Sequence, residues 1–109
     1  MADKDLLSLW EEVYLLAICE LRDDAYGVAI KKSVSQKTGR VLSYGGLYFM
    51  LAQLRKKGFV EKRTGEPSPR RGGRRKYYYL LTERGKKALR TSFEFQNSLW
   101  RDIKEPVFD

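Results

Sequence analysis

The sequence has 109 residues and a mass of 12.7 kDa, a size that suits one compact domain. Lysine and arginine number 22 against 14 aspartates and glutamates, which gives a formal net charge of +8, and there is no histidine. The lack of histidine removes the commonest general base and metal ligand, and a single cysteine forms neither a thiolate zinc site nor an intrachain disulfide. We therefore expect no metal ion, no cofactor and no enzymatic activity, and we interpret Cys19 as a buried apolar side chain.

The positive charge is concentrated in the middle of the chain. Residues 1–30 carry a net charge of −5, residues 31–90 carry +15 and residues 91–109 carry −2. A basic centre between acidic ends is typical of a chain whose centre meets a polyanion, the alternative being a solvated basic face. The N-terminus is acidic where a signal peptide would be basic, and the longest apolar run, residues 13–19, is too short to span a bilayer. We expect a cytoplasmic protein without membrane contact.

Two helices are predicted in the N-terminal part. Apolar residues between positions 6 and 21 extend around most of the circumference of a helix, so some of that surface must meet another subunit or lie deep in the core. Asp24 is the candidate N-cap of a second helix over residues 25–37, and Gly39 is its stop. The candidate inward residues of the second helix are Val28, Ile30 and Val34.

A third helix is predicted from Ser43, as its N-cap, through Lys57 to Gly58. Its apolar stripe has the spacing i, i+3, i+4, i+7 and consists of Leu47, Met50, Leu51 and Leu54. Glycine costs up to about 1 kcal/mol of helix stability relative to alanine, so glycines in this helix favour a surface that a partner approaches closely. The face opposite the apolar stripe carries Gly45, Phe49, Ala52 and Lys56, flanked by Tyr48 and Gln53.

The C-terminal half is predicted to form two strands and a last helix. Residues 59–64 and 76–81 are the strands, and the connection between them holds two prolines, three glycines and four arginines, a composition that predicts a mobile cationic arm. Thr82 is the predicted N-cap of a helix that runs to about Lys104 and ends before Pro106. A heptad-like stripe on this helix indicates packing against another helix; it consists of Leu89, Phe93, Gln96, Trp100 and Ile103, widened by Phe95 and Leu99.

This order of elements predicts a winged helix-turn-helix. In that fold the third helix enters the major groove of DNA, and the two-stranded ribbon, or wing, lies against the flanking backbone. The expected fold class is mainly α with a small β ribbon, plus a C-terminal dimerisation helix. We expect the winged helix-turn-helix in residues 1–81, with the first helix also in dimer contact, and the dimerisation helix and tail in residues 82–109 of the same compact unit.

Four segments also carry a resemblance to a known family: 42–48 (LSYGGLY), 58–60 (GFV), 72–79 (GGRRKYYY) and 81–85 (LTERG). In this order and spacing they resemble the PadR family of bacterial transcription regulators, over about residues 10–89. The resemblance implies a dimeric DNA-binding repressor of the short type, whose single C-terminal helix pairs with the first helix across the dimer. The chain departs from the family pattern at Gly46, Phe49, Gln53 and Arg55, which bears on the operator sequence rather than on the fold.

The residues expected to contact DNA lie in the third helix, in the turn before it and in the cationic arm. The Ser43 hydroxyl and the free amides at the helix start are expected to hold a phosphate, and Tyr44 and Tyr48 to hydrogen-bond phosphates. Phe49 is expected to contact a thymine methyl and Gln53 to bond an adenine, the alternative being that Tyr44 or Phe49 packs under the wing or the second helix. The full set is Lys37, Arg40, Ser43, Tyr44, Gly45, Gly46, Tyr48, Phe49, Gln53, Lys56, Arg70, Arg71, Arg74, Arg75 and Lys76.

The two end helices are expected to form a dimer interface. The candidate residues are Trp10 and Val13 of the first helix with Leu89, Phe93, Gln96, Trp100 and Ile103 of the last. The alternative is that the same residues also form a pocket for a small aromatic effector, which the family resemblance implies between subunits. The predicted function is a sequence-specific regulator, a repressor that binds a palindromic double-stranded DNA operator as a homodimer and that such an effector relieves. A winged-helix module that binds RNA or a partner protein is the alternative.

Overall fold

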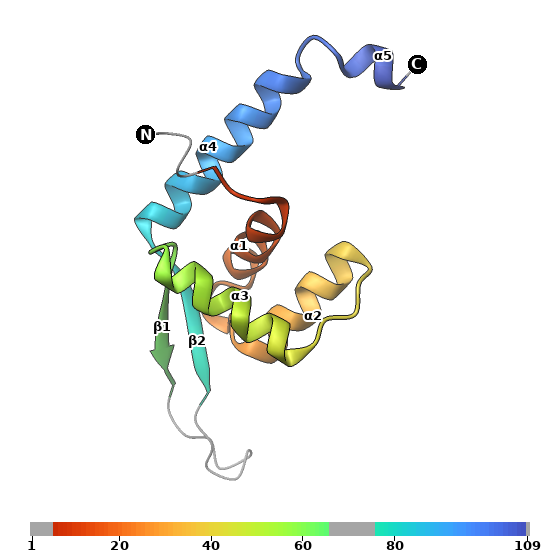
Figure 1. Cartoon of the computed structure of the whole chain (residues 1–109). Coiled ribbons are helices and arrows are strands. Elements are labelled where there is room, and N and C mark those ends of the chain that lie inside the picture. The colour runs from red at the N-terminus through yellow and green to blue at the C-terminus, as the bar shows by residue number, and fades with distance from the viewer. Residues whose placement is uncertain (1–5, 66–75, 109) are drawn as a thin grey trace.

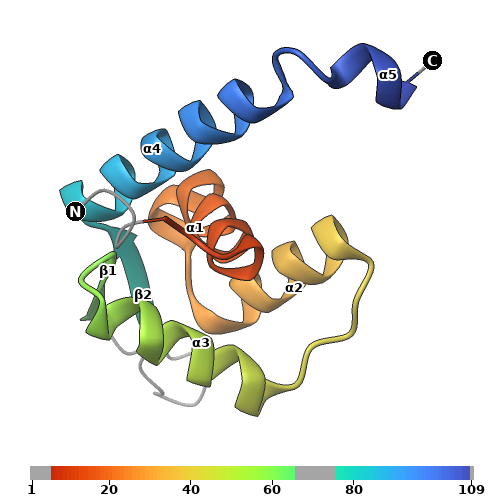
Figure 2. The ribbon, with the colours of Figure 1, turned by 45° about the horizontal axis from the view of Figure 1, so that its top comes forward.

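The computed structural model of the chain describes residues 6–65 and 76–108. The elements follow the order α1 (Leu9–Leu21), 3₁₀ helix η2 (Arg22–Asp24), α2 (Gly27–Thr38), α3 (Tyr44–Lys56), β1 (Val60–Thr64), β2 (Tyr77–Leu81), α4 (Glu83–Trp100) and α5 (Lys104–Phe108). Helix α1 lies in the middle, with α2 and α3 on one side and α4 on the other, and α4 extends away from the rest of the molecule toward α5 (Figures 1 and 2). The predicted fold class, mainly α with a small β ribbon and a C-terminal helix, is confirmed.

Helix α1 is the centre of the core. Ser8 caps it in a reciprocal capping box with Glu11, and Leu15, Ala17 and Ile18 are buried. Cys19 is exposed, so its interpretation as a buried side chain is wrong. Each residue of a helix is rotated by about 100° from the one before it, which takes Cys19 away from the side that Ile18 buries.

Helix α2 begins later than predicted. Residues 22–24 form the 3₁₀ turn, and Tyr26, rather than Asp24, is the N-cap. A hydrogen bond from far along the chain explains the later start of the helix. The Tyr79 amide donates to the Ala25 carbonyl at 2.8 Å and holds this segment extended beside β2. Gly39 ends the helix with φ 68°, as predicted.

The predicted inward face of α2 is partly wrong. Ile30 and Val34 are fully buried, but Val28 is 53% exposed. Val28 faces the hollow beside the turn between α2 and α3, which nothing in the described chain fills. The apolar character of a single position did not distinguish burial from exposure here.

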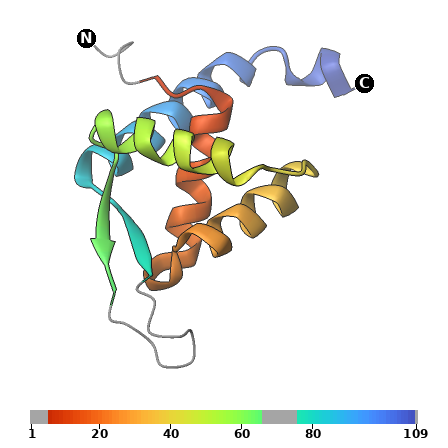
Figure 3. The same cartoon turned by 60° about the horizontal axis from the view of Figure 1, so that its bottom comes forward.

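Helix α3 matches its prediction. The Ser43 hydroxyl accepts from the Gly46 amide at 2.9 Å, and Leu47, Leu51 and Leu54 are fully buried. Gly58 follows the helix with φ 82°, a conformation that favours glycine. Helix α3 crosses α1, with α2 beneath the turn that leads into it (Figure 3).

The two strands form an antiparallel sheet in the register Val60↔Leu81 to Thr64↔Tyr77. Phe59, Val60 and Tyr79 are buried and attach the base of this wing to the core. The predicted cationic arm between the strands, with Arg70, Arg71, Arg74 and Arg75, lies outside the described residues.

Helix α4 begins as predicted and ends differently. The Thr82 hydroxyl accepts from the Gly85 amide at 3.0 Å and donates to the Gly58 carbonyl at 2.6 Å. The helix ends at Trp100, before Pro106 as predicted but short of the expected Lys104, and the separate short helix α5 contains Pro106. Pro106 lies in the first turn of α5, where its missing N–H has no intrahelical partner to lose.

Candidate nucleic-acid interface

The outward face of α3 is open to solvent. Gly45, Ala52 and Lys56 are exposed and Gln53 is half-buried, as the periodicity of the helix predicts. Phe49 is 66% exposed, so the alternative that it packs under the wing or under α2 is wrong. A phenyl ring without a partner in the described chain stands near the middle of this face.

Two glycines at the start of α3 have different surroundings. A Cβ added at Gly46 would lie 3.1 Å from the Ser43 hydroxyl oxygen, so the cap itself limits the side chain there. A Cβ added at Gly45 would meet nothing within 4 Å. Nothing within the described chain therefore explains the absence of a side chain at Gly45.

Two tyrosines bridge α2 and α3. The rings of Tyr44 and Tyr48 stack with centroids 6.4 Å apart, and the Lys31 ammonium lies 5.0 Å above the Tyr44 ring. The Tyr48 hydroxyl lies so close to Gly27 that a Cβ there would be 2.4 Å from it. Both tyrosines remain about half exposed. Gly27 was not among the predicted site residues, because its role depends on a tyrosine in another helix.

The turn between α2 and α3 borders a basic hollow. Lys31, Lys32 and Arg40 line it together with Tyr44, and Val41 in the same turn is 98% exposed. Lys37 is not part of this group. Its ammonium forms an ion pair with Glu20 of α1 at 2.6 Å, on a different side of α2.

The end of the wing next to the cationic arm holds a second basic group. The Lys76 ammonium lies 3.5 Å from the centroid of the Tyr26 ring, and Tyr26 packs edge-on against Tyr78 at 5.9 Å. Lys62 lies over Tyr77 in the same way, at 4.3 Å. These contacts attach the wing to the segment before α2 and set the point from which the chain enters the cationic arm. Tyr26, which carries the attachment, was not among the predicted site residues.

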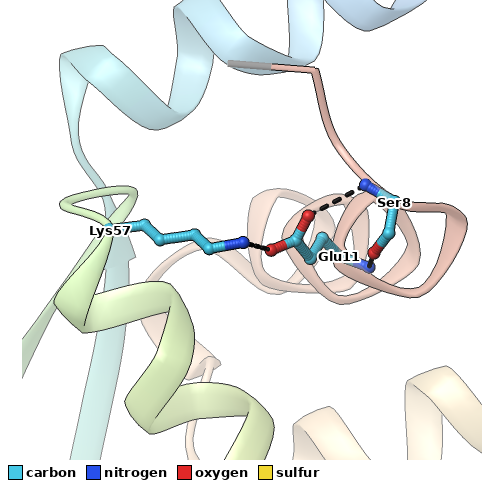
Figure 4. Close-up of polar contacts among 3 residues, drawn as sticks. All are labelled: Ser8, Glu11 and Lys57. Atoms are coloured by element: carbon cyan, nitrogen blue, oxygen red, sulfur yellow. Dashed lines mark hydrogen bonds and ion pairs between the residues drawn. The ribbon is translucent and has the colours of Figure 1, made fainter. Parts of the chain in front are cut away.

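A buried carboxylate fixes the C-terminal end of α3 against α1. Glu11 accepts from the Lys57 ammonium and from the Ser8 amide, as Figure 4 shows. Burial alone would raise the pKa of Glu11, but the hydrogen bonds from Lys57 and Ser8 outweigh it, and the pKa is lowered from its ordinary value of 4.5. The ion pair therefore holds α3 at a defined position on the core.

The candidate dimer residues divide into two groups. Val13 and Leu89 are half-buried and pack against the core of their own chain. Trp10, Phe93, Trp100 and Ile103 are exposed, Phe93 to 64%.

Gln96 has a partner within its own chain, because its amide donates to Glu12 of α1 at 2.7 Å. Val107 and Phe108 of α5 extend the exposed apolar surface, and the Phe108 ring lies 5.9 Å from that of Trp100. Neither residue of α5 was among the predicted interface residues, although an apolar pair beside Pro106 was a visible signal.

The described residues also bear on metal and membrane sites. Within residues 6–65 and 76–108 no three histidine, cysteine, aspartate or glutamate side chains are grouped as a metal site would require. In the same part of the chain, no helix has the length and apolar character needed to cross a bilayer.

Comparisons with known proteins match both the sequence and the fold. The family model described as the transcriptional regulator PadR-like family matches residues 15–91. A PadR family transcription regulator from Clostridium difficile R20291 is 31% identical, with a TM-score of 0.61 over 88% of this chain and 92% of that one. No curated protein matches the sequence.

Two further solved structures are similar. One is described as the complex structure of hsRosR-S4; it is 28% identical, with a TM-score of 0.72 over 99% of this chain and 93% of that chain. A transcriptional regulator from Clostridium thermocellum is 27% identical, with a TM-score of 0.66 over 87% of this chain and 89% of that one.

Proposed function

Because the chain belongs to the transcriptional regulator PadR-like family, we propose that it is a repressor that binds a palindromic double-stranded DNA operator as a homodimer. As a member of this family it regulates transcription and is not an enzyme. We place the DNA-binding unit in residues 1–81 and the dimerisation helix and tail in residues 82–109. We also propose that the protein is bacterial and acts in the cytoplasm, where the DNA of a bacterial cell lies.

The observation that carries the DNA contact is the exposed face of α3, uncharged over residues 44–53, between two basic groups. Lys31, Lys32 and Arg40 border one side of this face, and Lys62 and Lys76 lie on the wing, toward its arm end. Such a distribution suits a helix in the major groove with phosphates on both sides of it. Residues 31–90 carry +15, which favours a polyanion over a neutral partner.

Three features of α3 define the roles that we propose for its residues. The Ser43 cap and the first free amides of the helix hold a phosphate, and Gly45 lets the DNA backbone approach without a side chain between them. Tyr44 and Tyr48 donate their hydroxyls to phosphates on the α2 side. Arg70, Arg71, Arg74 and Arg75 in the arm, with Lys76 at its base, neutralise phosphates beyond the groove.

The apolar surface of α1, α4 and α5 supports the proposed dimer. Leu9 and Leu16 on α1 are exposed, as are the aromatic side chains of α4 and α5. Exposed large apolar side chains in such number are typical of an interface, and residues 91–109 carry a net charge of −2. A second copy of the chain buries these side chains, with α4 of one copy against α1 of the other.

The space between α4 and α5 supports a small-molecule effector. Asn97, Trp100, Arg101 and Phe108 line a hollow in which two aromatic rings lie 5.9 Å apart. Aromatic side chains favour flat aromatic ligands, and the proposed dimer brings two such hollows near one axis. Binding there releases the operator.

Selection of bound duplexes from a random DNA pool, together with the solution mass of the protein, tests this proposal. The expected result is a palindromic site with half-sites about one helical turn apart and a mass of twice 12.7 kDa. Competition with bulk DNA and with RNA completes the test, since an operator-binding protein prefers its site over both by a large factor. A monomer without sequence preference, or a preference for RNA, would overturn the proposal.

A further inference from the structure

The middle of the outward face of α3 is apolar. Phe49 and Ala52 lie there, both exposed, between Gly45 at the N-terminal end of the face and Lys56 at its C-terminal end. Residues 44–53 include no lysine, arginine, aspartate or glutamate. The central turns of the helix therefore present a phenyl ring and a methyl group instead of charged side chains.

The side chains that flank this apolar centre leave it uncovered. The Tyr48 ring stacks on Tyr44 and its hydroxyl lies against Gly27, so the side chain leans toward α2 and away from Phe49. On the other flank, Gln53 is half-buried and carries an amide that both donates and accepts hydrogen bonds. One apolar group thus stands next to one bifunctional polar group.

The base edges in the major groove differ in what they offer to such a surface. Guanine is read most often by arginine or lysine, and cytosine by an acidic side chain, neither of which the central turns of α3 contain. Thymine presents a C5-methyl group, and adenine presents a donor and an acceptor that match the amide of glutamine. The chemistry of the face therefore suits thymine and adenine.

Resting on the proposed operator binding, we propose that Phe49 is a specificity-determining residue that recognises the 5-methyl group of thymine. Gln53, on the same side of the helix, bonds an adjacent adenine. The basic groups on both sides, with Lys32 and Arg40 at the turn and Lys76 at the wing, hold phosphates and bring the phenyl ring to the floor of the groove.

Replacement of thymine by deoxyuridine tests this inference, because it removes only the methyl group and keeps base pairing. Each thymine of the selected operator is replaced in turn, and the affinity of the full-length protein is measured at fixed salt. We expect about a fourfold loss of affinity at one or two positions in each half-site. This is the factor in affinity that burial of one methyl-sized group contributes. The same replacement in the flanking DNA, outside the site, changes nothing.

Variants assign the loss to one residue. Phe49→Ala is expected to bind the thymine and uracil operators equally, whereas Phe49→Leu keeps a penalty for uracil because it keeps an apolar contact. Val41→Ala is the matched control, since Val41 is also exposed and apolar but lies in the turn before α3, and it keeps the full penalty. The exposure of Phe49 predicts unchanged thermal unfolding in both of its variants.

The outcomes separate this inference from the proposed function. A uracil penalty that persists in Phe49→Ala, or an operator in which no thymine methyl matters, overturns the role of Phe49 while specific binding stands. If no duplex is preferred over bulk DNA, the proposed function fails, and the role of Phe49 fails with it.

Discussion

Glu11 and Glu12 are neighbours in α1, yet each carboxylate contacts a different element. Glu11 accepts from Lys57 at the C-terminal end of α3, and Glu12 accepts from Gln96 of α4 at 2.7 Å. Helix α1 therefore connects the helix with the candidate DNA-binding face to the helix with the exposed aromatic residues. The buried member of the pair, Glu11, is the one whose loss is expected to matter more for stability.

Lys57→Met is expected to destabilise the protein by about 1–2 kcal/mol at pH 7, because it leaves the buried Glu11 carboxylate without its cation. The pKa of Glu11 is lowered in the folded state, so the stabilisation is complete above its ordinary value of 4.5 and is lost as the pH falls through the folded pKa. The difference between wild type and variant in urea unfolding should therefore shrink between pH 7 and pH 3. Lys56→Met, at the exposed neighbouring position, is the control, and its stability should match that of wild type at both pH values. A difference that does not change with pH would contradict the assigned ion pair.

Gly45→Ala is expected to leave the folded protein as stable as wild type, or more stable by up to about 1 kcal/mol, since the added methyl group meets nothing and alanine favours a helix. Operator affinity should nevertheless fall about tenfold or more, because the methyl group stands where we propose that the DNA backbone approaches. Thermal unfolding and operator titration give the two values. Gly46→Ala, whose Cβ would lie 3.1 Å from the capping Ser43 hydroxyl, is the comparison and should lower stability. Full operator affinity in Gly45→Ala would remove the proposed close approach.

Replacement of both Arg74 and Arg75 by alanine is expected to weaken binding to all DNA sequences alike. Two lost phosphate contacts should reduce the slope of log affinity against log salt by about 1.8. The slope is measured by titration at several salt concentrations, with operator and with bulk DNA. Lys87→Ala removes one exposed positive charge from α4 instead and should leave the slope unchanged. An unaltered slope in the double variant would show that the arm does not bind phosphates.

Phe93→Glu is expected to convert the proposed dimer into a monomer, because it places a charge on the apolar surface that we propose a second copy covers. The side chain is exposed in the single chain, so helical content should be retained. Sedimentation velocity measures the mass, and operator titration should show a parallel loss of affinity. Val41→Glu makes the same exchange at an exposed position on the candidate DNA surface; it should keep the dimer mass and weaken only DNA binding. A dimer mass for Phe93→Glu would exclude that face as the interface.

Local signals in the sequence predicted the elements that depend on local interactions. Ser43 and Thr82 act as caps, and Gly39 and Gly58 have the positive φ that their positions at helix ends suggested. The apolar spacing of α3 also predicted which of its faces is exposed, so most of the candidate DNA-binding helix was predictable. These features are determined by residues within one or two turns of each other.

The features that the sequence did not predict depend on contacts between distant residues. Asp24 had the right chemistry for an N-cap, but hydrogen bonding of the neighbouring segment to β2 moved the start of α2 to Gly27. The ion pair between Lys57 and Glu11 spans 46 positions, and no periodicity indicates it. Lys37 likewise looked like a phosphate ligand in the sequence, whereas its nearest charged partner is Glu20 of α1.

Helix α4 acts as a lever in the proposed dimer. Its 18 residues span about 27 Å, and its contacts with the core lie in the part up to Gln96. When the helix pivots at its Trp100 end, a tilt of about 5° moves its other end, which follows β2 of the wing, by about 2 Å, more than half of the roughly 3.4 Å rise of one base pair. An effector bound beside Trp100, as we propose, would therefore shift the two recognition helices relative to two half-sites without any change inside either DNA-binding unit.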